Sequence, residues 1–251
     1  MTERRTAVVT GGGSGIGRAI SHRLARDGFA IAVMDLNPDS AESVAEEIRH
    51  AGHEAVAFGG VDVSDRAQVD AGMQAVRDQL GPISVLVNNA GRTGFDKFLS
   101  ITDEQWDGIM AVNLNGPFYC CQAVLPEMIE AGWGRIVNIS SSSAQSGQQL
   151  MVHYVSSKAG LIGFTKALAL EVGRHGVTVN TIPPGFIDTP MLRASEEKGL
   201  LGGKVEDHAK TTPVRRAGTP DDIAAACSYL VSDDASYVTG QVLGVNGGRN
   251  T

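Results

Sequence analysis

The chain is poor in cysteine and holds no long apolar run. Its three cysteines, Cys120, Cys121 and Cys227, form neither a CxxC pair nor a spacing typical of disulfide-rich proteins. No apolar run approaches the length that spans a bilayer, and too few apolar residues follow Thr6 to form a signal-peptide core. We therefore expect a cytoplasmic protein in a reducing compartment, with no membrane partner.

Positive charge is also scarce. The chain has 21 lysines and arginines against 28 aspartates and glutamates, a formal net charge of -7. Nucleic acids and anionic lipids both attract proteins through clustered positive charge, so we expect neither as a partner. The one close histidine pair, His50 and His53, is not accompanied by a set of cysteines or carboxylates, so we expect a surface turn there and no metal site. A small-molecule substrate and further copies of the chain are the expected partners.

What the 251 residues do contain is a regular alternation of two patterns. Short apolar runs occur at 7–9, 30–34, 55–58, 83–87, 135–139, 177–182 and 241–245, and they are typical of strands covered on both faces. Helical patterns lie between them and supply the crossovers that parallel strands require. The sequence therefore predicts one α/β domain, residues 1–251, with a doubly wound parallel sheet and helices on both faces.

Two long helices and one irregular segment complete the plan. We expect helices over 103–131, opened by Thr102 or Asp103 as its cap, and over 152–173. Segment 188–219 departs from the alternation, with mixed charge and scattered leucines. We expect it to form a substrate lid over one end of the sheet; an ordinary surface excursion is the alternative.

A glycine-rich loop follows the first expected strand. Thr10, Gly11, Gly15 and Gly17 form the pattern TGxxxGxG, while Ile16 departs from the stricter GxGxxG. Backbone N–H groups and a helix N-terminus at such a loop bind the pyrophosphate of a dinucleotide. A purely structural turn would explain the glycines equally well without further context.

That context is an acidic residue at the end of the second expected strand. Asp35 can accept hydrogen bonds from both ribose hydroxyls and would repel a 2′-phosphate. Positions 14 and 36 are occupied by Ser14 and Leu36, so no arginine there offsets that repulsion. We therefore expect NAD in preference to NADP. Asp62 and Val63 follow the third strand and are expected near the adenine, although a helix cap explains part of that stretch too.

Tyr154 and Lys158 stand four residues apart within the second long helix, so they project from one face. A nearby ammonium favours the phenolate and lowers the pKa of the tyrosine. Such a phenol can protonate an alkoxide or deprotonate an alcohol. An exposed helical pair without chemistry is the alternative.

Together these motifs resemble the short-chain dehydrogenase/reductase family over essentially the whole chain. TGGGSGIG at 10–17, NNAG at 88–91, Asn113 in "MAVNLNG", the serine run before Tyr154, and "PGFIDTP" at 184–190 occur in the family's order. The resemblance implies a Rossmann-type fold, a nicotinamide cofactor and reversible hydride transfer between an alcohol and a ketone. It also implies a homotetramer formed partly through helices 103–131 and 152–173.

The resemblance also implies a role for each matching residue. Tyr154 would be the general acid and base, Lys158 would lower its pKa and bind the nicotinamide ribose, and Asn113 would hold a water that links Lys158 to solvent. The expected cofactor contacts are Gly11, Ser14, Gly15, Ile16, Gly17, Asp35, Leu36, Asp62, Val63, Asn89, Ala90, Gly91, Tyr154, Lys158, Pro184, Gly185, Ile187 and Thr189. The expected substrate walls are Ser143, Gln148, Phe186, Met191 and Leu192.

The serine run in "NISSSSAQSG" is expected to supply one catalytic hydroxyl. If the strand continues into it, Ser141 and Ser143 share one face. The family's serine commonly stands 13 residues before the tyrosine, which points to Ser141, and a change in loop length would point to Ser142 instead. Ser141 is therefore expected to hold the substrate oxygen.

Several substrates remain open. We expect an NAD-dependent dehydrogenase of a neutral cyclic or short-chain secondary alcohol. A 3-oxoacyl thioester reductase, on carrier protein or CoA, is the alternative, because that branch shares "SKAGLIGFTKALALEVG" and "PGFID". That branch generally uses NADPH with basic residues where this chain has Ser14 and Asp35. A non-catalytic NAD(H)-binding regulator is a more distant alternative.

Overall fold

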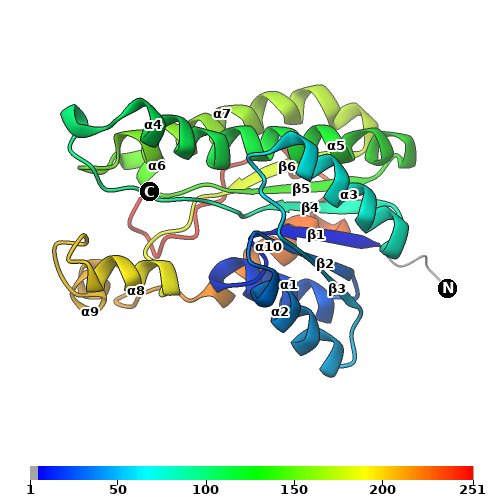
Figure 1. Cartoon of the computed structure of the whole chain (residues 1–251), viewed down its shortest axis with the longest axis horizontal. Coiled ribbons are helices and arrows are strands. Elements are labelled where there is room, and N and C mark those ends of the chain that lie inside the picture. The colour runs from blue at the N-terminus through cyan, green and yellow to red at the C-terminus, as the bar shows by residue number, and fades with distance from the viewer. Residues whose placement is uncertain (1–4, 251) are drawn as a thin grey trace.

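The computed structural model describes residues 5–250 and shows one parallel sheet between two layers of helices (Figure 1). The strand order is β3-β2-β1-β4-β5-β6, and each neighbouring pair is parallel. This is the predicted doubly wound, Rossmann-type α/β fold. The strands are β1 (Thr6–Thr10), β2 (Ala30–Asp35), β3 (Ala55–Gly59), β4 (Ile83–Asn88), β5 (Gly134–Ile139) and β6 (Val177–Ile182).

Helices bury both faces of this sheet, which is why the strands are continuous apolar runs. One face is covered by α1 (Gly15–Arg26), α2 (Pro38–His50) and α10 (Pro220–Val231), and the other by α3 (Arg66–Leu80), α5 (Gly116–Ala131) and α7 (Val152–Val172) (Figure 1). Every residue of β1, β5 and β6 is buried. Two apolar cores result, one on each side of the sheet.

The segment expected as one helix over 103–131 is instead broken by a wider turn. Helix α4 (Asp103–Met110) has Thr102 as its cap, as predicted, and is followed by a π-helical turn, η2 (Ala111–Asn115), before α5 begins. The extra residue in this turn belongs to the stretch that carries Asn113, which is fully buried. Single π turns inside helices are frequent at functional sites.

The expected strand at 241–245 was wrong. This segment touches the edge of the sheet only through isolated bridges, Thr181 to Val242 and Pro184 to Val245. The side chain of Asn180 takes over part of the hydrogen bonding there, since it donates to the carbonyl of Val238 and accepts from the N–H of Gln241. A regular ladder of backbone bonds is therefore interrupted at this edge.

Segment 188–219 forms an excursion with two short helices, α8 (Pro190–Glu197) and α9 (Val205–Thr211), on the side of the molecule where the C-terminus also lies (Figure 1). Its two ends meet in a bridge between Ile187 and Gly218, whose N–H donates to the carbonyl of Phe186 at 2.8 Å. The remaining short elements are η1 (Phe98–Ser100), α6 (Ser143–Ser146), η3 (Gly173–His175) and η4 (Asp233–Ala235). Within residues 5–250, no helix combines the length and the apolar character that crossing a bilayer requires.

Candidate active site

A large hollow, which we call the main cavity, lies at the carboxyl ends of the strands. Its volume is about 960 Å³, at the upper end of the range of small-molecule and cofactor sites. The residues that follow β1, β2, β3, β4, β5 and β6 all contribute to its lining. In open α/β sheets this edge is where ligands bind.

The glycine loop forms one wall of the main cavity and has no room for side chains. A Cβ on Gly17 would lie 2.0 Å from the carbonyl oxygen of Gly11, and a Cβ on Gly11 would lie 2.9 Å from the Cα of Ala90. Gly11 and Gly15 also have positive φ angles, 61° and 50°, which glycine adopts at little cost. The loop therefore brings bare backbone to the cavity at the start of α1, as a pyrophosphate site requires.

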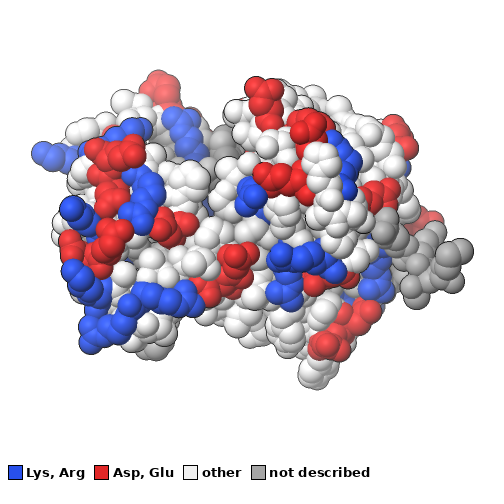
Figure 2. All heavy atoms as spheres, turned by 90° about the horizontal axis from the view of Figure 1, so that it is seen from below, with Lys and Arg blue, Asp and Glu red and all other residues white. Residues whose placement is uncertain are grey.

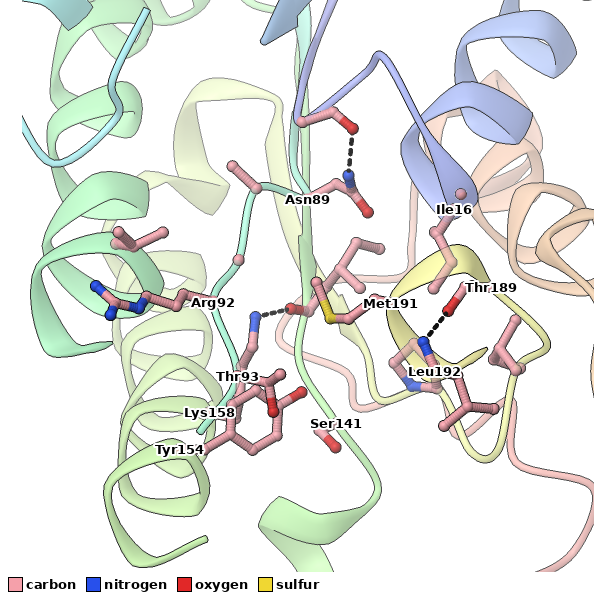
Figure 3. Close-up of a pocket in the computed structure, with 18 of the residues that line it drawn as sticks. Ile16, Asn89, Arg92, Thr93, Ser141, Tyr154, Lys158, Thr189, Met191 and Leu192 are labelled. Atoms are coloured by element: carbon pink, nitrogen blue, oxygen red, sulfur yellow. Dashed lines mark hydrogen bonds between the residues drawn. The ribbon is translucent and has the colours of Figure 1, made fainter. Parts of the chain in front are cut away.

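The NNAG motif is joined to this loop by a compact set of hydrogen bonds. The hydroxyl of Thr10 accepts from the N–H groups of Asn89 and Ala90, both at 3.1 Å. The amide of Asn89 donates to the carbonyls of Thr10 and Gly11, both at 3.0 Å (Figure 3). These bonds hold the ends of β1 and β4 together and fix the floor of the cavity.

Asp35 ends β2, as predicted, and its carboxylate faces the glycine loop. One oxygen accepts from the N–H of Gly13 and the other from the N–H of Asn37, both at 2.9 Å. A carboxylate has about four acceptor positions, so both oxygens keep capacity for further hydroxyl donors. Leu36 beside it is 65% exposed and lines the cavity. Asp62, in contrast, accepts from the N–H and hydroxyl of Ser64, which gives it a local turn-forming role as well.

The serines of the run have different surroundings. β5 ends at Ile139, so the run is not strand and the predicted alternation does not apply. Ser140 is buried and donates to the carbonyl of Lys158 at 2.9 Å. Ser141 and Ser143 still lie together, with their hydroxyl oxygens 2.8 Å apart, because the chain turns into α6 after Ser142.

Tyr154 and Lys158 come from one face of α7 and lie beside Ser141 (Figure 3). Burial raises the pKa of the Tyr154 phenol, and a hydrogen bond with Ser141 opposes that rise. Burial lowers the pKa of Lys158 to about 8, and its ammonium donates to the carbonyl of Ile139 at 2.8 Å. The hydrogen bond between the Ser141 hydroxyl and Tyr154 therefore favours the phenolate.

Asn113 lies behind the cavity in the π turn. Its amide nitrogen donates to the carbonyl of Arg92 at 2.9 Å and to the hydroxyl of Ser157 at 3.0 Å, and its oxygen accepts from the N–H of Arg92 at 2.8 Å. A Cβ on Gly91 would lie 3.4 Å from both the Asn113 oxygen and the Lys158 nitrogen. Asn113 thus fixes the chain after NNAG and reaches the neighbourhood of Lys158.

The structure brings nearly all the predicted residues to one cavity. Gly17 and Asn113 are the two that do not line it: Gly17 packs against the loop from behind, and Asn113 lies beneath Gly91. The predicted residues that line the cavity are Gly11, Ser14, Gly15, Ile16, Asp35, Leu36, Asp62, Val63, Asn89, Ala90, Gly91, Ser141, Ser143, Gln148, Tyr154, Lys158, Pro184, Gly185, Phe186, Ile187, Thr189, Met191 and Leu192.

Three charged or titratable residues near the site were missed. Arg92 and Arg249 line the main cavity, so the expectation of a neutral substrate came from an incomplete set of walls. His153 is fully buried, accepts from the N–H of Tyr154 at 3.0 Å and lies 3.2 Å from a carboxylate oxygen of Asp96. Its position directly before Tyr154 was the available signal. The sequence held no such signal for Arg249, which is far from the other site residues along the chain.

The charges elsewhere on the surface are mixed. On the face shown in Figure 2, positive and negative side chains are interspersed rather than gathered by sign. Within residues 5–250, no group of three or more histidine, cysteine and carboxylate side chains is placed to hold a metal ion. The three cysteines are buried and unbridged, and burial raises the pKa of Cys121 and of Cys227 to about 12.

The sheet, the glycine loop and the Ser141, Tyr154 and Lys158 cluster define a Rossmann-type oxidoreductase that binds a nicotinamide cofactor. The family model described as short chain dehydrogenase matches residues 5–199. The chain belongs to the short-chain dehydrogenase family.

Relatives and solved structures agree with this membership. The chain is 40% identical over 244 residues to a 3-oxoacyl-[acyl-carrier-protein] reductase of Chlamydia muridarum, covering 97% of this chain and 96% of that protein. It is 41% identical over 250 residues to an acetoacetyl-CoA reductase of Cupriavidus necator, covering 99% and 98%. A solved tryptophan variant of the actinorhodin polyketide ketoreductase, with NADPH, superposes with a TM-score of 0.94 at 35% identity, covering 100% and 99% of the two chains.

Proposed function

We propose that the protein is an NAD(H)-dependent oxidoreductase that interconverts a secondary alcohol and a ketone. The observation that carries this proposal is the convergence of Ser141, Tyr154 and Lys158 in one cavity that Asp35 also lines. The first three are the groups that the reaction needs, and the fourth discriminates between the two nicotinamide cofactors.

The residues present fit a dinucleotide. Gly11 and Gly17 leave a cradle that a Cβ would fill, the N-terminus of α1 lines the cavity where it would attract an anion, and Asp35 retains acceptor capacity for ribose hydroxyls. The nicotinamide, when bound, supplies or accepts the hydride. The carboxylate of Asp35 would repel a 2′-phosphate, which supports NAD over NADP.

The proton is moved by this chain's own residues. In the oxidative direction the Tyr154 oxygen takes the proton of the substrate hydroxyl, and in the reductive direction it returns that proton. The Ser141 hydroxyl donates a hydrogen bond that favours the phenolate and positions the substrate oxygen. Lys158 holds a buried positive charge within this cluster, which also favours the anionic form of a nearby oxygen.

Replacing Tyr154 with phenylalanine tests this assignment. Initial rates with NAD across cyclic alcohols, linear alcohols and 3-hydroxyacyl thioesters would identify a substrate, and Tyr154→Phe should then lower kcat by about 10²- to 10⁴-fold, the usual contribution of general acid–base catalysis. Tyr237→Phe is the matched control, because Tyr237 is fully exposed and outside the cavity. Full activity of Tyr154→Phe would overturn the assignment.

A 3-oxoacyl thioester is the second candidate substrate, reduced on carrier protein or CoA. The names of the two curated relatives support it, since both are reductases of 3-oxoacyl thioesters. The apolar walls at the reacting end, Phe186, Met191 and Leu192, suit a cyclic or short-chain alcohol and an acyl chain equally. A protein that bound NAD but turned over none of these substrates would support the non-catalytic regulator instead.

A further inference from the structure

The charged residues that line the main cavity are divided by sign. The two acidic ones are Asp35, the last residue of β2, and Asp62, which follows β3, and both belong to the expected nucleotide contacts. The cations are Arg92, Lys158 and Arg249. The guanidinium of Arg92 lies against Gly108 of α4, and the side chain points away from Ser141 and Tyr154 (Figure 3). Lys158 belongs to the catalytic cluster, which leaves Arg249 as a cation with no role in the reaction.

The end of the chain is held across the substrate side of the cavity. The Asn250 amide donates to the carbonyl of Ser142 at 2.6 Å, beside the catalytic serine. The Asn246 side chain donates to the carbonyl of Asn250 at 3.0 Å and accepts from the N–H of Gly248 at 2.9 Å. These bonds fix both sides of Arg249.

The guanidinium of Arg249 lies over the ring of Phe186, with 5.6 Å from its central carbon to the ring centroid. Phe186 is itself a wall of the cavity, so this contact directs the arginine to the substrate end. A cation–π contact at this distance uses none of the N–H groups as hydrogen-bond donors, so these donors remain available to a ligand.

Arg249 also lacks a carboxylate of its own. Arg193 and Arg216 each bind carboxylates at 3.0 Å or less, whereas none of the carboxylates within residues 5–250 lies within 4.0 Å of Arg249. The guanidinium offers donors in a fork that matches a carboxylate or phosphate. Arg249 contacts an aromatic ring, lines the cavity and has no ion pair with a carboxylate of residues 5–250, so its guanidinium is suited to a ligand anion.

We propose that Arg249 is a specificity residue that binds an anionic group of the substrate. This proposal rests on the proposed function, because the anion belongs to the molecule whose hydroxyl or ketone meets Ser141 and Tyr154. The anion is either a carboxylate on the substrate's carbon skeleton or a phosphate of a thioester carrier. Phe186 and the bond from Asn250 to Ser142 place it on the side of the cavity that the serine run lines.

Matched substrate pairs test this proposal and separate the two sources of the anion. One pair is a hydroxy acid and its methyl ester, and the other is a 3-hydroxyacyl-CoA and the same acyl group on N-acetylcysteamine, which lacks the phosphates. Arg249→Gln should lower kcat/KM for the charged member of one pair by about 10- to 100-fold, the loss of a hydrogen bond to a charged group. The neutral member should change less than about twofold, and Arg249→Lys should restore part of the preference.

The control variant is Arg26→Gln, which removes the same charge from an exposed arginine of α1 outside the cavity. Any purification tag belongs at the amino terminus, because Asn250 is bonded to the site. Equal preference for the charged members in wild type and Arg249→Gln, or no such preference in wild type, would overturn the proposal.

A binding titration keeps this test independent of turnover. Benzoate and benzamide have nearly the same shape and differ in charge, and their binding to the protein with NADH can be followed by calorimetry. We expect benzoate to bind more tightly than benzamide to wild type and equally to Arg249→Gln. If the alcohol panel gives no turnover while this difference persists, the proposed reaction fails and the anion site stands. If turnover occurs and the difference is absent, only the anion site fails.

Discussion

Four adjacent serines illustrate how one residue position decides a chemical role. Ser140 is turned into the protein and bonds the backbone of α7, while Ser141 meets both Ser143 and Tyr154. Ser142 contributes its backbone, which donates to the carbonyl of Pro184 and accepts from Asn250. All four serines line the cavity, and Ser141 is the one whose side chain is hydrogen-bonded to Tyr154.

Replacing single serines tests this division of roles. Ser141→Ala should lower kcat by about 10²-fold or more, because it removes a donor to the reacting oxygen. Ser142→Ala is the matched control and should retain kcat within about twofold, since surface-type substitutions away from such contacts have small effects. Steady-state rates with the best substrate of the panel provide the measurement, and the opposite ranking would move the catalytic hydroxyl to Ser142.

Lys158 makes the stability of the fold depend on pH. Its pKa is lowered from 10.5 to about 8 by burial, so between these values the unfolded chain holds a proton that the folded chain has lost. Lowering the pH through this range therefore favours unfolding, and below pH 8 the effect is constant. Above pH 10.5 the Lys158 contribution to stability is at its maximum.

A comparison with Lys158→Met isolates this effect. As the pH falls from 10.5 to 8, wild type should lose about 3 kcal/mol of unfolding free energy relative to the variant. Urea denaturation at several pH values measures the difference, and the contribution of titrating groups that do not interact with Lys158 cancels between the two proteins. If the difference in unfolding free energy between wild type and Lys158→Met were the same at every pH, the pKa of Lys158 would not be lowered by burial.

At the scale of elements, α8 and α9 are joined through one arginine. Arg193 in α8 binds Asp188 at 2.7 Å, and Glu196 and Glu206 at 3.0 Å each, so it ties the start of the excursion to both helices. Its charge is thereby matched by carboxylates of its own segment, which speaks against a role for Arg193 in holding a CoA phosphate. Met191 and Leu192, on the same helix, line the cavity.

Removing this arginine should loosen the segment without changing the chemistry. Arg193→Ala is expected to raise KM several-fold while kcat changes little, because loops and lids of this kind act on binding and closure. Hydrogen exchange over 188–219 should increase in the variant. Lys198→Ala, an exposed change on the same segment, is the control. Unchanged hydrogen exchange over 188–219 in Arg193→Ala would contradict the idea that the ion pairs of Arg193 hold this segment in place.

The same scale shows what sequence patterns can and cannot predict. Continuous apolar runs gave all six strands, because burial on both faces leaves an unambiguous pattern. The π turn at Ala111–Asn115 has a helix-like sequence, and its extra residue follows from tertiary bonds of Asn113. Segment 241–245 has the composition of a strand but meets a sheet edge partly occupied by Asn180. Both errors arise from side-chain bonds to distant backbone.

The site divides in the same way. Residues within ordered motifs, such as Gly11, Asp35 and Tyr154, were predicted because their spacing carries the chemistry. Arg249 was missed because it reaches the cavity from the far end of the chain, through bonds of its neighbours to Ser142. Contacts between distant segments of this kind leave no local signal in one sequence.

At the scale of the whole molecule, we propose a homotetramer that uses α5 and α7. Phe118 of α5 and Leu170 of α7 are 41% and 89% exposed, and both helices belong to the outer layer of one face (Figure 1). Val124 and Leu161 of the same two helices are fully buried and belong to the core. The apolar side chains available for an interface on this layer are therefore the exposed ones, such as Phe118 and Leu170.

A charge at this surface should separate the copies. Leu170→Glu is expected to shift the mass measured by analytical ultracentrifugation from a tetramer towards smaller species, because burying an unpaired carboxylate is unfavourable. Leu99→Glu, at a 95% exposed site on η1, is the control. A monomeric wild type, or an unchanged tetramer in Leu170→Glu, would contradict the proposed interface.

Cofactor preference tests the central claim most directly, because it depends both on dinucleotide binding at the glycine loop and on the carboxylate of Asp35. The measurement is the ratio of kcat/KM with NAD to kcat/KM with NADP, for one alcohol, in wild type and in Asp35→Asn. We predict a wild-type ratio of at least about 10, from repulsion of the 2′-phosphate by a carboxylate, and a clear fall in Asp35→Asn. A wild-type preference for NADP, or a ratio that Asp35→Asn leaves unchanged, would contradict the account.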